Sequence, residues 1–159
     1  MLTKYFTAKI KIPPEKSQRQ RAYIEALETL DQIEIFYGKY QSNKVECNKC
    51  GNIMLKSNEK MTDVNIAVEM LNDAFFNRFE TAILVSADSD LSAPVKTIKK
   101  NFPNKRIVCA FPPKRFYYEL SVISDAHFII GRKKFKDSLF PDEVEKPDGF
   151  KLKKPITWI

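Results

Sequence analysis

A chain of 159 residues, 43% hydrophobic and 12% aromatic, can bury one well-formed core but is too short for two domains of ordinary size. No apolar run approaches the ~20 residues of a membrane-spanning helix, so we expect no membrane segment, no secretory signal and a cytoplasmic protein. The net charge of +7 favours polyanionic partners, above all nucleic acid, and the odd number of three cysteines indicates reduced thiols rather than a disulfide framework.

The first part of the chain predicts the order strand, helix, strand. Residues 4–12 are rich in aromatic and β-branched residues and predict a strand that two prolines end. Residues 15–30 carry apolar side chains at helical spacing, and residues 33–40 predict a second strand. The basic run in the helix, with Arg19 and Arg21, is either a solvated helix start or a patch that contacts phosphate.

A Cys-x-x-Cys-Gly turn follows, formed by Cys47, Cys50 and Gly51, and turns of this kind occur in zinc knuckles. A closed zinc site has four ligands, but Cys109 lies in a predicted core strand and His127 begins another. Three interpretations remain open: Zn²⁺ held with ligands from a second subunit, a turn without metal, and a degenerate half-site.

Residues 60–75 predict the strongest helix, with one apolar face that should pack flat on a sheet. That face comprises Val64, Ala67, Val68, Leu71, Ala74 and Phe75. Asp63 lies in the first turn, after the candidate N-cap Thr62. Asp63 is either an ordinary favourable charge on the helix dipole or a metal ligand. Lys60 beside it is either an exposed ion-pairing lysine or a cation that stabilises developing negative charge.

The central stretch of the chain is an apolar, β-branched run that starts at Thr81 and stops at Asp88 and Asp90, before a helical pattern from Leu91 to Lys100. It predicts a buried parallel strand that ends in a βα loop, at the sheet edge where α/β proteins bind ligands. If the chain stays extended, both carboxylates point the same way, and Mg²⁺ or Mn²⁺ would relieve their repulsion. Either aspartate could instead cap the following helix; the pair, with Asp63 elsewhere, favours the metal.

The remaining elements predict a further strand over residues 106–111, a helix over residues 116–124 and a short strand over residues 127–130. Lys114 and Arg115 follow the first of these strands, and we include them with Arg19 and Arg21 as candidate contacts to nucleic acid.

We expect one domain over residues 1–131 and a basic extension over residues 132–159 that lies on the domain surface. Trp158 is a candidate hydrophobic anchor for this extension. Its basic clusters are solvated charge or, with neighbouring aromatic rings, contacts to RNA.

Two motifs occur together: Lys60-Met61-Thr62-Asp63-Val64 at the start of a helix, and Ser86-Ala87-Asp88-Ser89-Asp90 after a strand. With them the sequence resembles the NYN-domain family of the PIN-like superfamily of metal-dependent ribonucleases, from about residue 4 to residue 131. The resemblance implies an α/β fold of the Rossmann-like type, three layers (α/β/α) around a mainly parallel sheet. It carries Asp63, Asp88 and Asp90 over as catalytic ligands of Mg²⁺ or Mn²⁺, and Ser86 as a supporting polar group.

The sequence departs from the family pattern in two places. Ala87 stands where the family usually has glycine. Family members also begin with a strand that ends in an aspartate ligand and is expected at the centre of the sheet, whereas this chain has no aspartate before Asp31. Either the sheet closes differently, or a second copy or another chain supplies a strand, or the reading frame begins upstream.

We therefore predict a metal-dependent ribonuclease that hydrolyses RNA phosphodiester bonds. The alternative is a catalytically impaired RNA-binding or regulatory module. Another kind of phosphoryl-transfer enzyme or nucleotide binder is disfavoured, because the chain has four glycines and no glycine-rich phosphate loop.

Overall fold

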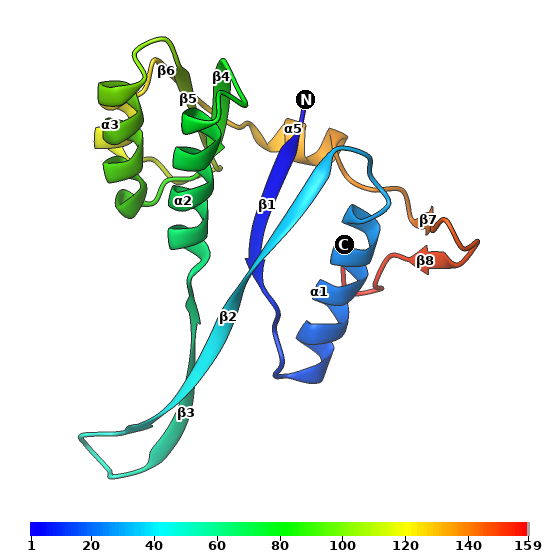
Figure 1. Cartoon of the computed structure of the whole chain (residues 1–159). Helices are drawn as coiled ribbons and strands as arrows, with labels where there is room; N and C mark the ends of the chain where they lie inside the picture. The colour runs from blue at the N-terminus through cyan, green and yellow to red at the C-terminus, as the bar shows by residue number, and fades with distance from the viewer. Residues whose placement is uncertain (159) are drawn as a thin grey trace. The chain divides into compact units, whose positions relative to one another are not determined.

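The computed structural model of the chain describes residues 1–158, without the side chains of residues 55–57. The protein is a mixed α/β protein whose described strands form three separate sheets (Figure 1). The chain divides into two compact units, Met1–Thr62 with Phe140–Ile159, and Asp63–Leu139. Each unit is described below by itself.

The first unit contains a mixed sheet and one long helix. Its elements are β1 (Thr3–Ala8), α1 (Pro14–Leu27), β2 (Ile33–Glu46), β3 (Ile53–Lys60), β7 (Glu143–Glu145) and β8 (Lys151–Lys153). β1 runs parallel to the first part of β2, from Thr3 opposite Ile33 to Ala8 opposite Gly38. β3 runs antiparallel to the rest of β2, from Lys39–Lys60 to Glu46–Ile53.

The β2–β3 hairpin therefore continues beyond the part of β2 that β1 covers, as a two-stranded arm (Figure 1). We use "arm" for residues 39–60 throughout. The sequence pattern predicted β2 only as far as residue 40 and did not predict β3. None of the described side chains of the arm is buried, and residues 41–46 are polar apart from Val45, so they lack the apolar alternation by which half-buried strands are recognised.

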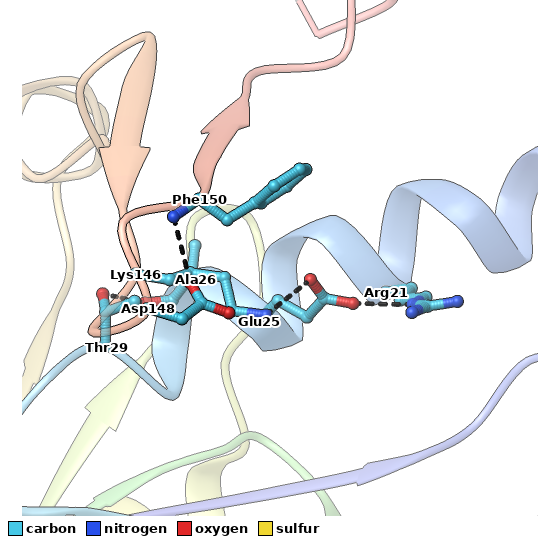
Figure 2. Close-up of polar contacts among 7 residues, drawn as sticks. All are labelled: Arg21, Glu25, Ala26, Thr29, Lys146, Asp148 and Phe150. Atoms are coloured by element: carbon cyan, nitrogen blue, oxygen red, sulfur yellow. Dashed lines mark hydrogen bonds and ion pairs between the residues drawn. The ribbon is translucent and has the colours of Figure 1, made fainter.

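The C-terminal residues of the first unit pack on α1. The Tyr23 ring lies 6.1 Å from that of Phe140 and 6.2 Å from that of Trp158, both edge to face. Lys146 pairs with Glu25 at 3.5 Å, and Glu25 also accepts from Arg21 at 2.6 Å (Figure 2). Trp158 is thus a hydrophobic anchor, as its position in the sequence suggested.

The second unit contains a parallel three-stranded sheet of order β4-β5-β6. Its elements are α2 (Thr62–Phe75), β4 (Thr81–Val85), the 3₁₀ turn η1 (Ser89–Leu91), α3 (Ser92–Asn101), β5 (Arg106–Phe111), α4 (Tyr118–Ile123), β6 (Ala126–Ile129) and α5 (Arg132–Asp137). The core gathers around fully buried side chains of β5, α3 and α4, among them Phe111, Ile107, Ile98, Val95 and Leu120. The helices and strands predicted over residues 91–130 are confirmed, with ends shifted by a few residues.

β4 is an edge strand, and the prediction that it is buried is wrong. Only Leu84 of this strand is buried, whereas Ile83 and Val85 are 53% and 59% exposed. Within the described part of the chain β4 pairs with β5 alone. Strands of parallel sheets normally have both faces covered, so β4 is unusually uncovered for its composition.

The buried face of α2 also differs from the prediction. Ala74 is buried, and Ile66, Met70 and Leu71 pack against the core, but Val64, Val68 and Phe75 are largely exposed. Helical periodicity locates an apolar stripe but does not show which edge of a wide stripe meets the core. Here the contact lies to one side of the predicted face.

The expected single, mainly parallel sheet is not confirmed. The first sheet is mixed, the second parallel and the β7–β8 pair antiparallel. Among the described helices, none combines the length and the apolar character needed to cross a membrane.

Candidate metal and nucleic-acid site

Asp88 and Asp90 lie just after β4, where the chain turns into η1. Asp88 has an extended backbone and is the N-cap of this turn: its Oδ1 accepts the backbone N–H of Asp90 at 3.0 Å. The chain is therefore not extended from Asp88 to Asp90, and the capping role weighed for Asp88 is present. Both carboxylates are exposed, so capping leaves the pair open to solvent and to a ligand.

Ser86 holds the start of this turn. Its Oγ accepts the backbone N–H of Asp88 at 3.1 Å. The hydroxyl therefore holds the backbone that carries the first carboxylate. Ala87, between them, packs against the core of the unit.

Asp63 lies in the first turn of α2 and is exposed. Thr62 begins the helix, and its hydroxyl donates to the Glu59 carboxylate at 2.5 Å. Lys60 is exposed at the end of β3. Among the residues that the structure describes, no group of three or more His, Cys, Asp or Glu side chains could hold a metal ion. Asp63, Asp88 and Asp90 thus do not form a closed three-carboxylate site in this conformation.

Lys114 and Arg115 follow β5, the neighbour of β4. The two strands are parallel, with Val85 opposite Ala110, so the loops after them leave the same edge of the sheet. Both basic residues are exposed, and the turn is closed by the Arg115 N–H, which donates to the Pro112 carbonyl at 3.1 Å. At the carboxyl ends of the strands of this sheet, an acidic loop therefore follows β4 and a basic loop follows the neighbouring strand β5.

Arg19 and Arg21 belong to α1 in the first unit. Arg21 forms an ion pair with Glu25 (Figure 2). The hydrogen bond from Arg21, together with the nearby charge of Lys146, holds the pKa of the Glu25 carboxyl below its usual range. Arg19 donates to the Thr157 hydroxyl at 3.5 Å. Arg21 is consequently already partly neutralised, which makes it a weaker candidate for phosphate contact than Lys114 or Arg115.

Cys47 and Cys50 lie in the turn at the tip of the arm. The Cys50 and Gly51 N–H groups donate to the Cys47 carbonyl at 3.3 and 2.8 Å, and Gly51 has a φ of +64°. Backbone N–H groups of Lys49 and Cys50 also donate to the Cys47 sulfur and lower the pKa of its thiol. The turn therefore surrounds one sulfur with hydrogen-bond donors that favour its thiolate form more than water does.

Sequence reasoning missed the surroundings of this turn. Val45 and Met54 are cross-strand partners next to it, and Ile53 follows; all three are exposed. The apolar residues on either side of the cysteines are too few to predict two strands from their pattern alone.

The chain is similar to known proteins in sequence and in fold. The model of the NYN domain matches residues 3–131. A crystal structure of a protein of unknown function from Vibrio parahaemolyticus has a similar fold, with a TM-score of 0.56, 23% identity, and coverage of 83% of this chain and 70% of that chain. No curated protein matches. Because the family model spans most of the chain, including both acidic motifs, the chain belongs to the NYN-domain family.

Proposed function

We propose that the protein is a metal-dependent ribonuclease. The observation that carries this proposal is the pair of exposed aspartates, Asp88 and Asp90, at the carboxyl end of β4, on the same sheet edge as the exposed Lys114 and Arg115. Membership of the NYN family supports it, since this domain suggests a PIN-like nuclease. An acidic loop for a cation beside a basic loop for phosphate is the arrangement that phosphodiester hydrolysis needs.

The metal in this proposal is Mg²⁺ or Mn²⁺, held by Asp88 and Asp90 with Asp63 as a further ligand. The donors fit in type: they are hard carboxylate oxygens, exposed so that water can complete the coordination shell. They do not yet fit in number, because the described side chains contain no three-donor group. Once bound, such an ion supplies an activated water and stabilises charge on the phosphate.

The protein's own residues have simpler tasks. Ser86 and the Asp88 cap hold the acidic loop in place through their hydrogen bonds. Lys114 and Arg115 would bind the RNA backbone without reading its sequence, and Lys60 would stabilise negative charge that develops beside Asp63.

We further propose that the complete site has an additional strand along β4, contributed by a second copy or another chain. This would produce the continuous, Rossmann-like three-layer sheet implied by the family resemblance. The exposed Ile83 and Val85 support it, since an added strand and its connections would cover them. A parallel strand there would bring its own carboxyl end to Asp88 and Asp90 and could supply the missing donor.

The test is cleavage of a labelled RNA by the full chain with Mn²⁺ and with EDTA, compared with Asp88→Asn. Asparagine caps helices as well as aspartate does, so this variant keeps the turn and loses the charge. Asp137→Asn, which changes an exposed carboxylate on α5, is the matched control. We expect Mn²⁺-dependent cleavage that Asp88→Asn abolishes and Asp137→Asn retains. Cleavage that persists in Asp88→Asn would contradict the proposal.

The second candidate function is that of an RNA-binding or regulatory module without turnover, and it rests on the departure from the family pattern, in which an aspartate ligand precedes the position of Asp31. Binding of the same RNA with no Mn²⁺-dependent cleavage, at any protein concentration, would select this alternative.

A further inference from the structure

The arm presents an exposed two-stranded surface. Residues 41–46 of β2 and Ile53 and Met54 of β3 are all exposed, and β1 ends its pairing with β2 at Gly38. A two-stranded hairpin without a packed face is only marginally stable in water. A second element that packs on the arm, or a metal that closes its tip, would supply the missing stabilisation.

The tip has the geometry of half a tetrathiolate site. Cys47 and Cys50 are three residues apart in a tight turn. Two backbone hydrogen bonds close this turn: the Gly51 N–H donates to the Cys47 carbonyl, and the Cys47 N–H donates to the Asn52 carbonyl at 2.9 Å. Backbone N–H groups of Lys49 and Cys50 approach the Cys47 sulfur, and hydrogen bonds of this kind stabilise a metal-bound thiolate. Such a turn presents two sulfurs to one soft cation.

The other two ligands do not come from the same chain. Cys109 is fully buried in β5. The single histidine, His127, packs its ring against Phe111 and Phe116 at 6.0 and 5.9 Å between ring centroids. With its third thiol buried, one chain has at most Cys47, Cys50 and His127 as sulfur or imidazole ligands, which is one short of four, and no described cluster offers three donors. Since a closed Zn²⁺ site has four ligands, a second Cys47–Cys50 pair is the complement that fits.

The side chains around the tip suit contact with another copy. Val45 and Met54 form a directly opposed pair on one face of the arm and are 41% and 54% exposed, whereas Ile53, opposite Glu46, lies on the other face and is 62% exposed. Exposed apolar side chains clustered beside a metal half-site are typical of an interface. The exposed Lys44 and Lys49 outnumber Glu46, so two tips together carry the positive charge that offsets the two negative charges of a zinc tetrathiolate.

We propose that two copies of the chain bind one Zn²⁺ between their arms, with Cys47 and Cys50 of each copy as the four ligands. The pairing is two-fold symmetric, so the same apolar residues of both arms meet around the ion. Each of the four thiols loses its proton to solvent on binding, since zinc coordinates the thiolate. This inference is independent of the proposed nuclease activity.

The test is zinc content and mass in solution of the full chain, measured by metal analysis and by light scattering, before and after removal of metal with a chelator. We expect one zinc ion per two chains, a dimer, and dissociation to monomers after chelation. Cys47→Ser should lose both zinc and dimerisation, whereas Cys109→Ala, which alters the buried thiol of β5, should retain both. Co²⁺ in place of Zn²⁺ should show the absorption of a tetrahedral tetrathiolate.

Two results would overturn the inference. The first is a chain that takes up no zinc when the metal is supplied under reducing conditions. The second is a zinc-loaded monomer with one ion per chain, because its ligands would then come from one copy. Circular dichroism of Cys47→Ser, unchanged from the unsubstituted chain, excludes loss of the fold as the reason for lost zinc.

Discussion

At the scale of single residues, Gly38 is the position where the backbone leaves no room for a side chain. A Cβ at this position would lie 2.6 Å from the Lys60 carbonyl oxygen and 2.7 Å from the Thr62 hydroxyl. The first of these atoms belongs to the backbone, so it cannot move aside without shifting the end of β3. Gly38 therefore allows β2 to approach the end of β3 and Thr62 closely.

We predict that Gly38→Ala lowers the free energy of unfolding by about 1–3 kcal/mol, because the added methyl group forces β2 away from the end of β3. The measurement is chemical denaturation followed by circular dichroism. Gly131→Ala is the matched control, since a Cβ there meets no atom within 4 Å. Equal stability of the two variants would show that the approach at Gly38 is looser than the structure indicates.

The residues of the acidic loop show what sequence could and could not predict at this scale. The sequence located Asp88 and Asp90 correctly at the end of a strand, because an apolar run that stops at carboxylates is a local signal. It could not decide between a cap and a metal ligand for Asp88, since both functions use the same oxygen atoms. The buried Lys105, which donates to Asn77 and to the Phe79 carbonyl, was also missed, because its burial depends on a distant turn.

At the scale of elements, Asp125 joins three of them. Its carboxylate pairs with Lys99 of α3 and accepts the Ile107 N–H of β5 at 2.7 Å, and its own N–H donates to the Ile107 carbonyl just before β6 begins. The hydrogen bond from Lys99 is the main reason that the pKa of this carboxyl is held below its usual range. The ion pair is partly exposed, so its contribution is screened by solvent.

The lowered pKa of Asp125 predicts an acid dependence of stability. A carboxyl group with a lower pKa in the folded state stabilises the fold above its unfolded-state pKa, and this stabilisation is lost as the pH falls through the folded-state pKa. We expect the unsubstituted chain to lose stability between about pH 5 and pH 2, and Asp125→Asn to lose less over the same range. The variant should keep part of the pH dependence of stability, because the pKa values of Glu25 and Glu119 are also lowered.

The measurement is the denaturation midpoint of both chains from pH 7 to pH 2. The two curves should differ most near neutral pH and converge in acid. Parallel curves would show that the carboxyl of Asp125 has the same pKa in the folded and unfolded chain.

The elements that sequence predicted well are those with one buried face. β5 and α3 carry apolar side chains at the period of their structure and pack into the core, so their patterns were clear. None of the described side chains of β3 is buried, and its pattern did not predict a strand. The apolar stripe of α2 is wider than its contact with the core, so its pattern misplaced the buried face.

At the scale of the whole molecule, the division into units could not be read from the sequence. The first unit joins residues 1–62 to residues 140–159, although the whole second unit lies between them in the chain, and such a long-range association leaves no local pattern. Net charge, in contrast, is fixed by composition. The net charge of +7 comes from basic residues in both units. The Arg19–Arg21 pair differs from the Lys114–Arg115 pair, because Arg21 already forms an ion pair with Glu25.

This difference predicts how RNA binding responds to salt. The slope of log affinity against log salt concentration is negative, and each lost phosphate contact to a single strand reduces its magnitude by about 0.7. We expect the double variant Lys114→Ala/Arg115→Ala to bind RNA more weakly and to reduce the magnitude of the slope by about the amount that two phosphate contacts contribute. Arg19→Ala/Arg21→Ala removes the same charge but should change the slope less, because Glu25 already pairs with Arg21. The measurement is fluorescence anisotropy of a labelled single-stranded RNA over a range of salt concentrations. Equal effects of the two double variants would mean that the protein binds RNA through its net charge alone, and that the basic loop after β5 has no special role at the proposed site.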